Sequence, residues 1–313
     1  MLNRRQLRIK VMQALYAFFQ NPQQDATVAI NNLITSNKRT YDLYILLLSV
    51  FNELASLELA YIDDAPKRLA TRNPLSFRSR ISTMAFVKWL QGDFIFNEYV
   101  RKNSLSWQKE KDTFDKIYFN IRQDQDYRDY VNEEAPLPKM EKALLKKIFT
   151  EYFEKNEVFS HYIEEQNVFW AEGFEMQCAY VHKSLDSFNP SSSKNSILPA
   201  YKETEEDIDF IRKLFTETIR NDKEFATLIS EKTKNWDVDR IAIMDVILLK
   251  MALCEVLYMP NIPIKVSINE YIDISKIYST PKSNSFINGI IDNLVIELKR
   301  QSKITKTGRG LVE

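Results

Sequence analysis

The sequence predicts an all-α fold, and two observations carry this prediction. Apolar residues recur at spacings of three and four along most of the 313-residue chain, which is the period of an amphipathic helix. Only 5 residues are glycine. This scarcity disfavours glycine-rich phosphate loops, dinucleotide-binding turns and hairpin-rich sheets, whereas long helices tolerate few glycines. We therefore expect helical bundles.

The first predicted helix runs from about Arg4 to Gln20, where Asn21-Pro22 ends it. Its apolar stripe consists of Leu7, Val11, Ala14, Leu15 and Phe18. The same periodicity predicts a helix after Asp25 and further helices over residues 40–62, 81–99, 107–122, 140–153, 158–185, 205–221, 224–233, 240–258, 263–278 and 284–300. Residues 189–199 are polar, rich in serine and bounded by prolines, so we expect an exposed linker there.

The global composition indicates a reducing compartment and gives no sign of nucleic-acid binding. Lys+Arg and Asp+Glu both number 43, so any electrostatic argument must be local. Cys178 and Cys254 lie in apolar helical stretches, and we expect buried, reduced thiols without disulfides. The most apolar stretch, residues 43–59, contains Asn52, Glu53 and Glu58, which predicts that it does not span a bilayer. We expect a cytoplasmic protein without membrane contacts.

A weak internal repeat relates two parts of the chain at a constant offset of 66 residues. The identical residues are Lys147, Phe149, Thr150, Glu151, Phe159, Glu165 and Trp170, which match Lys213, Phe215, Thr216, Glu217, Phe225, Glu231 and Trp236, and Ile163 matches Ile229. Chance similarity between amphipathic helices is one explanation, and a duplicated helical unit is the other. Duplication predicts that Phe149, Phe159 and Trp170 are core residues.

The first 20 residues are strongly basic. They contain Arg4, Arg5, Arg8 and Lys10 and no acid. Arg4 and Arg8 share one helix face, and Arg5 lies on its flank. These cations repel one another, and the positive end of the helix dipole disfavours them further. RNA phosphate would offset that cost, although a solvated basic face or salt bridges to another helix are the alternative.

Two further features fit a single-stranded RNA surface. Tyr16 stands two turns beyond Arg8, and unstacked bases lie on aromatic rings while guanidiniums hold phosphates. A second basic cluster closes the chain and comprises Lys299, Arg300, Lys303, Lys306 and Arg309. If the two ends of the chain meet, they form one positive surface on a neutral protein.

Several blocks of sequence resemble the NusB family of transcription antitermination factors. Residues 4–16 look like the arginine-rich opening helix of that family. Residues 236–292 are similar to its most recognisable stretch, with blocks at 240–242, 245–252, 262–270 and 283–292 in the family's order and spacing. Residues from about 39 to 200 have no counterpart in the short family members. The resemblance therefore implies NusB-like helices in 1–38, a helical insertion in 39–200 and a NusB-like bundle in 201–313.

The resemblance also implies a function. The family binds boxA sequences of ribosomal RNA leaders together with the ribosomal protein NusE, within the transcription elongation complex. By resemblance, Arg4, Arg5 and Arg8 are RNA-contacting residues, Tyr16 and Phe286 are aromatic residues at the RNA surface, and Asp245 faces NusE. We add Lys10, Lys282 and Asn284 to the predicted RNA surface.

Some of these assignments have alternatives. Phe286, Ile290 and Leu294 recur at spacings of four, which also predicts a core stripe. The family often carries an acid where Lys282 stands and a lysine where Ser285 stands, so the net effect of these two departures on RNA affinity is open.

The sequence offers little for catalysis. His161 and His182 have no ligand-like spacing, and the chain contains neither a nucleophile motif nor a P-loop, so we expect no metal, no cofactor and no enzyme. NusB-like domains also precede ribosomal RNA methyltransferase domains, but the similar segment ends almost at the last residue, and we expect no such domain. The alternative function is a protein-interaction scaffold in which the aromatic-rich insertion carries the main binding role.

Overall fold

The structure is a computed structural model that describes residues 3–21, 23–64, 80–171, 173–192, 196–233 and 241–307. Over these ranges the regular secondary structure is helical and contains no strand, so the predicted all-α fold is confirmed. The chain divides into two compact units: unit 1 comprises residues 1–37 and 200–313, and unit 2 comprises residues 38–199. That each segment is a separate domain stays a prediction.

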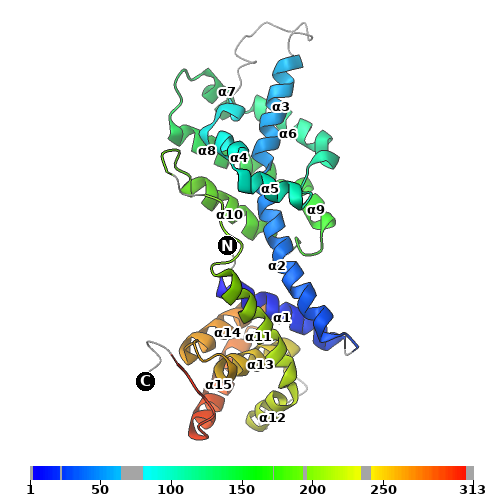
Figure 1. Cartoon of the computed structure of the whole chain (residues 1–313), viewed down its shortest axis with the longest axis vertical. Helices are drawn as coiled ribbons and strands as arrows, with labels where there is room; N and C mark the ends of the chain where they lie inside the picture. The colour runs from blue at the N-terminus through cyan, green and yellow to red at the C-terminus, as the bar shows by residue number, and fades with distance from the viewer. Residues whose placement is uncertain are drawn as a thin grey trace. The chain divides into compact units, whose positions relative to one another are not determined.

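Unit 1 is built around one central helix, α13, over Ile243–Tyr258. Its residues from Ile247 to Val256 are all buried, as expected for a helix covered on every side. The surrounding helices are α1 (Arg4–Gln20), the first half of α2 (Ala26–Leu48), α11 (Thr204–Arg220), α12 (Asp222–Lys232), α14 (Ile264–Tyr278) and α15 (Ser283–Arg300). Helices α1, α11, α12, α14 and α15 all pack against α13 (Figure 1).

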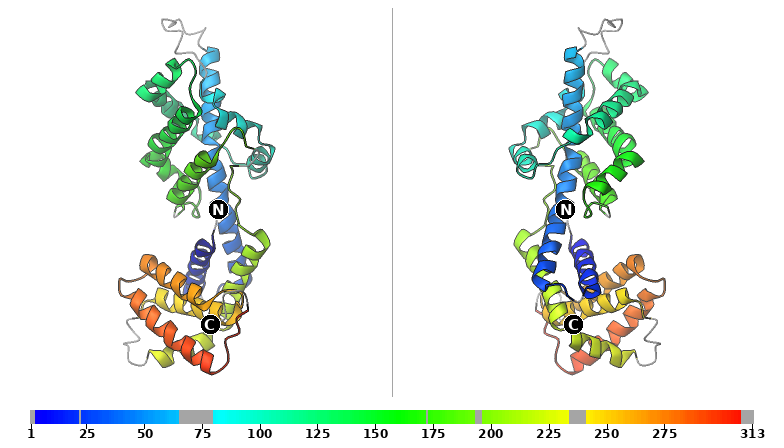
Figure 2. Two further views of the ribbon diagram at one scale, coloured as in Figure 1. Left: turned by 90° about the vertical axis from the view of Figure 1, so that its left-hand side faces the viewer. Right: turned by 90° about the vertical axis from the view of Figure 1, so that its right-hand side faces the viewer.

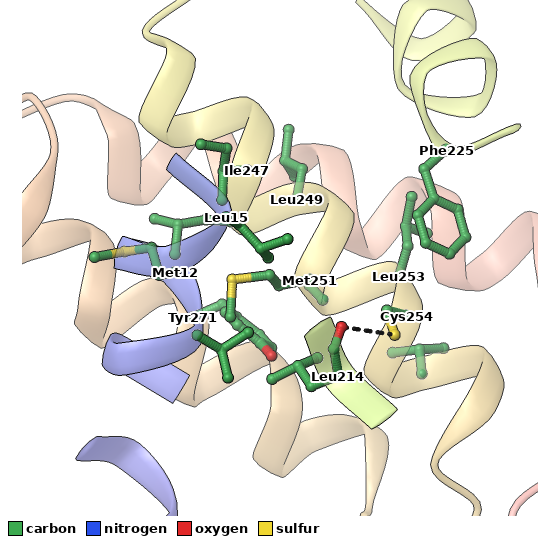
Figure 3. Packing of buried hydrophobic residues seen from close by; sticks show 14 of the residues in the cluster. Met12, Leu15, Leu214, Phe225, Ile247, Leu249, Met251, Leu253, Cys254 and Tyr271 are labelled. Carbon is green, nitrogen blue, oxygen red and sulfur yellow. Dashed lines mark hydrogen bonds between the residues drawn. The ribbon is translucent and has the colours of Figure 1, made fainter. Parts of the chain in front are cut away.

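The core of unit 1 joins residues from both ends of the chain. Met12 and Leu15 of α1 pack beside Met251 and Tyr271, from α13 and α14 (Figure 3). The predicted buried thiol is confirmed at Cys254, whose Sγ lies 3.8 Å from the Leu214 carbonyl oxygen. Burial raises the pKa of this thiol to about 12, so the group is an inert core residue.

Unit 2 contains shorter helices that pack through aromatic side chains. Its elements are the second half of α2, α3 (Val50–Asp64), η3 (Ile81–Thr83), α4 (Ala85–Gly92), α5 (Phe94–Lys102), η4 (Gln108–Glu110), α6 (Lys111–Gln123), α7 (Gln125–Asn132), α8 (Pro138–Phe149), the π-helical turn η5 (Thr150–Glu154), α9 (Glu157–Gln166) and α10 (Phe174–Ser187). At its centre, Phe114 and Phe159 lie 6.5 Å apart between ring centres, and each lies 5.1–5.6 Å from the rings of both Trp107 and Phe153.

Several helix boundaries predicted in unit 2 are wrong, and polar side chains explain the breaks. The predicted helix 40–62 is divided at Ser49, whose Oγ donates to the Leu46 carbonyl and accepts a hydrogen bond from Trp107 Nε1. The predicted helix 81–99 breaks at Asp93, which caps α5 by accepting from Phe96 N at 2.7 Å. The predicted helix 158–185 breaks at Asn167, which accepts from Phe169 N.

The structure favours duplication over chance for the internal repeat. Residues 138–154, which form α8 and η5, correspond at the offset of 66 to 204–220, the full extent of α11. Helix α9 corresponds in the same way to α12 within one residue. The core prediction is confirmed for Phe149, Phe159 and Trp170, which are all buried. The partner of Trp170, Trp236, lies outside the described residues.

The linker prediction needs a correction, and the apolar stretch is longer than the sequence predicted. The described parts of 189–199 are irregular, but Ser196 is buried and Leu198 N donates to the Tyr44 hydroxyl, so the segment is only partly exposed. The helical residues 26–63 are long and apolar enough to cross a membrane by length and composition alone, which one such helix supports only weakly. Half of the most apolar window is buried inside the structure, which a core helix shows equally well.

Glu58 of α3 fixes the position of residues 80–82 within unit 2. Its buried carboxylate accepts hydrogen bonds from the backbone N–H groups of Arg80, Ile81 and Ser82, and from the hydroxyls of Ser82 and Tyr127. Several donors thus depend on one carboxylate, and a buried donor without an acceptor is costly.

We predict that Glu58→Ala lowers the free energy of unfolding by about 3 kcal/mol, because it leaves these donors without an acceptor. Urea unfolding followed by circular dichroism measures this change. Asp63→Ala, at an exposed position of the same helix, is the control and should change stability by less than about 0.5 kcal/mol. Equal effects of the two substitutions would contradict the role given to Glu58.

Candidate nucleic-acid interface

Helix α1 starts with a capping box that fixes its first turn. The Asn3 side chain accepts from Gln6 N at 3.0 Å, and the Gln6 side chain accepts from Asn3 N at 2.8 Å. The first turn carries Arg4 and Arg5 and no acid. The capping box therefore places two guanidiniums at the positive end of a rigid helix.

Arg8 lies in the core of unit 1, with 2% of its surface exposed. Its Nε and Nη2 donate to the two carboxylate oxygens of Glu255 on α13, at 2.9 and 2.6 Å. Glu255 also accepts from Ser267 Oγ and from the Tyr271 hydroxyl. Burial alone would lower the pKa of Arg8, but the hydrogen bonds and charge of Glu255 outweigh it, and the pKa is raised. Only a small part of this side chain is accessible.

Arg4 and Arg5 are paired with acids but remain partly exposed. Arg5 donates to both oxygens of Glu270, at 2.9 and 3.0 Å, and to Asp273 at 2.9 Å. Arg4 Nε lies 2.9 Å from the Asp207 carboxylate, and its guanidinium carbon lies 4.5 Å from the centre of the Phe210 ring. The two side chains keep 38% and 42% of their surface exposed, for Arg4 and Arg5 respectively.

The prediction that Arg4, Arg5 and Arg8 form one phosphate-binding cluster therefore needs correction. The alternative, salt bridges to other helices, holds for all three. The Arg8 guanidinium is buried and donates to Glu255 and Glu270, so it presents almost no surface to an RNA, and its role as an RNA-contacting residue stays a prediction. Sequence reasoning missed the acids, which lie about 200 to 270 residues further along the chain. The sequence held one sign of these acidic partners: Glu270 and Asp273 lie one helical turn apart on α14 and therefore share a helix face.

A groove opens beside the first turn of α1. It has a volume of about 970 Å³ and lies between α1, α11 and the segment that leads into α14. Its lining residues are Asn3, Arg4, Arg5, Arg8, Glu206, Asp209, Phe210, Lys213, Met259, Pro260, Asn261, Ile262, Pro263, Val266 and Glu270. The exposed parts of Arg4 and Arg5 face a space that could hold several atoms of an extended ligand.

The C-terminal segment reaches the same region. Lys306 Nζ donates to the carbonyl oxygens of Glu255 and Met259, at 3.0 and 2.9 Å. Thr307 N donates to the Pro260 carbonyl oxygen at 3.0 Å. Because Glu255 also binds Arg8, the two ends of the polypeptide meet at the last turn of α13.

The other basic residues of the C-terminal cluster do not join Arg4 and Arg5. Lys299 and Arg300 end α15, where the negative end of the helix dipole favours cations. This end of α15 lies at the opposite side of unit 1 from the start of α1 (Figures 1 and 2). The predicted continuous positive surface is therefore wrong for these two residues, and Arg309 lies outside the described residues.

Two predicted contact residues are internal. Asp245 is buried, and its carboxylate accepts from Ser279 Oγ at 2.5 Å and from Ser283 Oγ at 2.7 Å. It joins the start of α13 to the turn before α15, and its contact with a partner stays a prediction. Phe286 is buried in the hydrophobic core, as the alternative based on its spacing predicted.

The remaining predicted residues have different exposures. Tyr16 is exposed, with 39% of its surface accessible, and Lys282 is exposed at the start of α15. Lys10 is half-buried on α1. Asn284 is half-buried, and its Oδ1 accepts from Ser285 N at 2.7 Å. Their roles in RNA binding stay predictions.

The fold and the site define a class of all-helical proteins in which a basic opening helix is fastened by ion pairs to a C-terminal helical bundle. Residues 177–295 match the family model for the NusB family. This part of the chain, from within α10 to α15, is therefore similar to the NusB family. The matched range starts within α10, a helix that belongs to unit 2, so the bounds of the predicted insertion 39–200 stay a prediction.

Three curated relatives, each called transcription antitermination protein NusB, are similar to part of this chain. The Salinibacter ruber protein is 44% identical over 104 residues, which cover 33% of this chain and 65% of that protein. The Chloroherpeton thalassium protein is 45% identical over 105 residues, which cover 34% of this chain and 50% of that protein. The Finegoldia magna protein is 38% identical over 89 residues, which cover 28% of this chain and 65% of that protein.

The similarity covers only part of this chain and only part of each relative. The aligned residues span half to about two thirds of these relatives' lengths. No solved structure matches the chain. The family model does not extend to α1, so the resemblance of residues 4–16 to the opening helix of the family stays a prediction.

We predict a pH effect at Lys306. Burial lowers its pKa to about 8, whereas the unfolded chain has the ordinary lysine pKa of about 10.4. Between these values the unfolded chain holds a proton that the folded chain lacks, so this residue's contribution to stability rises with pH. The free energy of unfolding of the natural protein should therefore increase between pH 7.5 and 10, relative to that of Lys306→Met.

Urea titrations of both proteins at several pH values measure this difference, and subtraction removes the effect of groups that titrate in both. A difference that stays constant or falls as the pH rises would show that Lys306 is not desolvated against the end of α13.

Proposed function

We propose that this protein is an RNA-binding transcription antitermination factor that acts on ribosomal RNA operons. It would bind a boxA-like single-stranded RNA together with the ribosomal protein NusE, within the transcription elongation complex. The single observation that carries the RNA part is the position of Arg4 and Arg5, partly exposed on a groove of about 970 Å³. The family of the C-terminal domain supports the antitermination role.

The ion pairs shape how these arginines would bind a phosphate. A guanidinium has five N–H donors, and the contacts of Arg5 with Glu270 and Asp273 use Nε and Nη2 and leave Nη1 out. The acids therefore fix the orientation of the guanidinium while one edge stays available. A phosphate would bind at this edge without breaking the pair, at a reduced net attraction because the neighbouring acids repel it.

Exposed residues extend the proposed surface. Tyr16 provides an exposed ring on α1 for base stacking. Lys213 is exposed and lines the groove opposite the arginines, although the family resemblance did not point to it. Lys282 contributes an exposed cation at the start of α15. We include these three residues in the proposed surface, with Lys10 and Asn284 as flanking positions.

The proposal includes neither catalysis nor a cofactor. Among the described residues, no group of three or more His, Cys, Asp or Glu side chains could hold a metal ion. His182 contacts Glu154 and Thr150 and lies against the Phe149 ring, which is a packing arrangement. We propose a cytoplasmic location because the nascent transcript is found there.

We predict that the double variant Arg4→Ala, Arg5→Ala binds boxA-like RNA at least about tenfold more weakly, because two charge-assisted contacts are lost. The slope of log K against log salt should become less steep by about 1.4, because each of the two lost phosphate contacts on a single strand contributes about 0.7. Fluorescence anisotropy with labelled RNA, with and without NusE, measures both quantities.

The matched control is the double variant Lys299→Ala, Arg300→Ala, at exposed positions of unit 1 on the side opposite the start of α1. It also removes two positive charges, but away from the groove, and should leave affinity and salt slope unchanged. Circular dichroism establishes that each variant is folded. If the double variant kept the affinity and the slope of the natural protein, Arg4 and Arg5 would not bind RNA and the proposed surface would be wrong.

A further inference from the structure

Two adjacent apolar side chains of unit 2 are exposed to solvent. Phe94 and Ile95, the first two residues of α5, have 76% and 70% of their surface exposed. The next residue, Phe96, is buried, and its N–H is held by the Asp93 carboxylate. Figure 2 shows the segment from α4 to α5, cyan to teal, on one side of α3. Exposed apolar residues in such a group indicate an interaction surface.

The other end of α4 borders an apolar pocket of about 470 Å³ between α4, α8 and the end of α10. Apolar side chains from all three regions form its walls: Phe86, Leu145, Leu185, Phe188, Pro138 and Pro190. The size is within the range of sites that enclose a ligand or a few partner side chains. The pocket and the exposed pair lie at the two ends of one eight-residue helix, which is about 12 Å long.

The pocket is formed in advance because polar contacts fix its walls. Lys142 Nζ donates to the carbonyl oxygens of Asp186 and Phe188, and Lys146 Nζ pairs with the Asp186 carboxylate at 2.9 Å. The Glu141 carboxylate accepts from Ala85 N at the start of α4. The Trp89 ring lies 5.4 Å from the Phe188 ring and extends the apolar wall along α4.

The charges beside Phe94 and Ile95 are complementary to those around the pocket. Asp93 and the exposed Glu98 flank Phe94 and Ile95. At the pocket, Lys146 pairs with Asp186, Lys142 offsets the charge of Glu141, and the exposed Lys139 leaves the rim with a net positive charge. An apolar group with acidic neighbours thus faces an apolar pocket with a basic rim, and both belong to the same chain.

We propose that unit 2 self-associates, with a second copy of this chain as the occupant of the pocket. A two-fold axis near the middle of α4 would insert Phe94 and Ile95 of each copy into the pocket of the other copy. Such an interface is self-complementary, so it forms a closed pair and uses both features twice. This proposal concerns a surface distinct from the proposed RNA groove in unit 1.

Sedimentation velocity of the full chain over about 1–100 μM, a range that includes typical dissociation constants of weak pairs, tests the proposal. The natural protein should shift from monomer to dimer as its concentration rises. The double variant Phe94→Ser, Ile95→Ser should weaken the association at least tenfold, because its side chains no longer fill the pocket. Lys139→Glu should weaken it by placing like charges together, and adding Glu98→Lys should restore it.

The matched control is Val158→Ser with Val168→Ser, which removes two comparably exposed apolar side chains, 72% and 79% accessible, elsewhere in unit 2. This variant should associate like the natural protein. A natural protein that stays monomeric throughout the range would overturn the proposal, as would a dimer that the substitutions of Phe94 and Ile95 leave intact. RNA binding is unaffected by either outcome, so the two proposals fail independently.

Discussion

The buried pair of Arg8 and Glu255 is the interaction on which unit 1 depends. It joins residues 247 positions apart and fastens α1 to the central helix α13. Removing both charges from water is costly, and the bidentate geometry together with Ser267 and Tyr271 offsets that cost. Lys306 binds the carbonyl oxygen of the same Glu255, so one residue positions both ends of the chain.

The same arrangement constrains the proposed function. The acids that hold Arg4 and Arg5 also reduce the attraction of these arginines for phosphate, so stability and RNA affinity oppose each other at the start of α1. A second component would then help to bind RNA, which agrees with a proposed complex in which a ribosomal protein contributes part of the surface.

The sequence predicted unit 1 more accurately than unit 2. The bounds of α1 agree with the structure to the residue, and those of α11, α12, α14 and α15 agree within a few residues, because long amphipathic helices have clear periodicity. In unit 2, single side chains such as Ser49 and Asp93 break helices through hydrogen bonds that periodicity does not reveal. At the site, the basic cluster was evident, but its acidic partners depend on tertiary contacts. For that reason Arg8 and Asp245 were assigned to ligands when the fold uses them internally.

The most direct test of this account is a double-mutant cycle of Arg8→Met and Glu255→Gln, measured as free energy of unfolding of the full chain. The account predicts that each single variant is strongly destabilised and that the double variant loses much less than their sum, with a coupling energy of about 3 kcal/mol. Additive effects, with a coupling below about 0.5 kcal/mol, would show that the pair does not fasten α1 to α13 and would contradict the account.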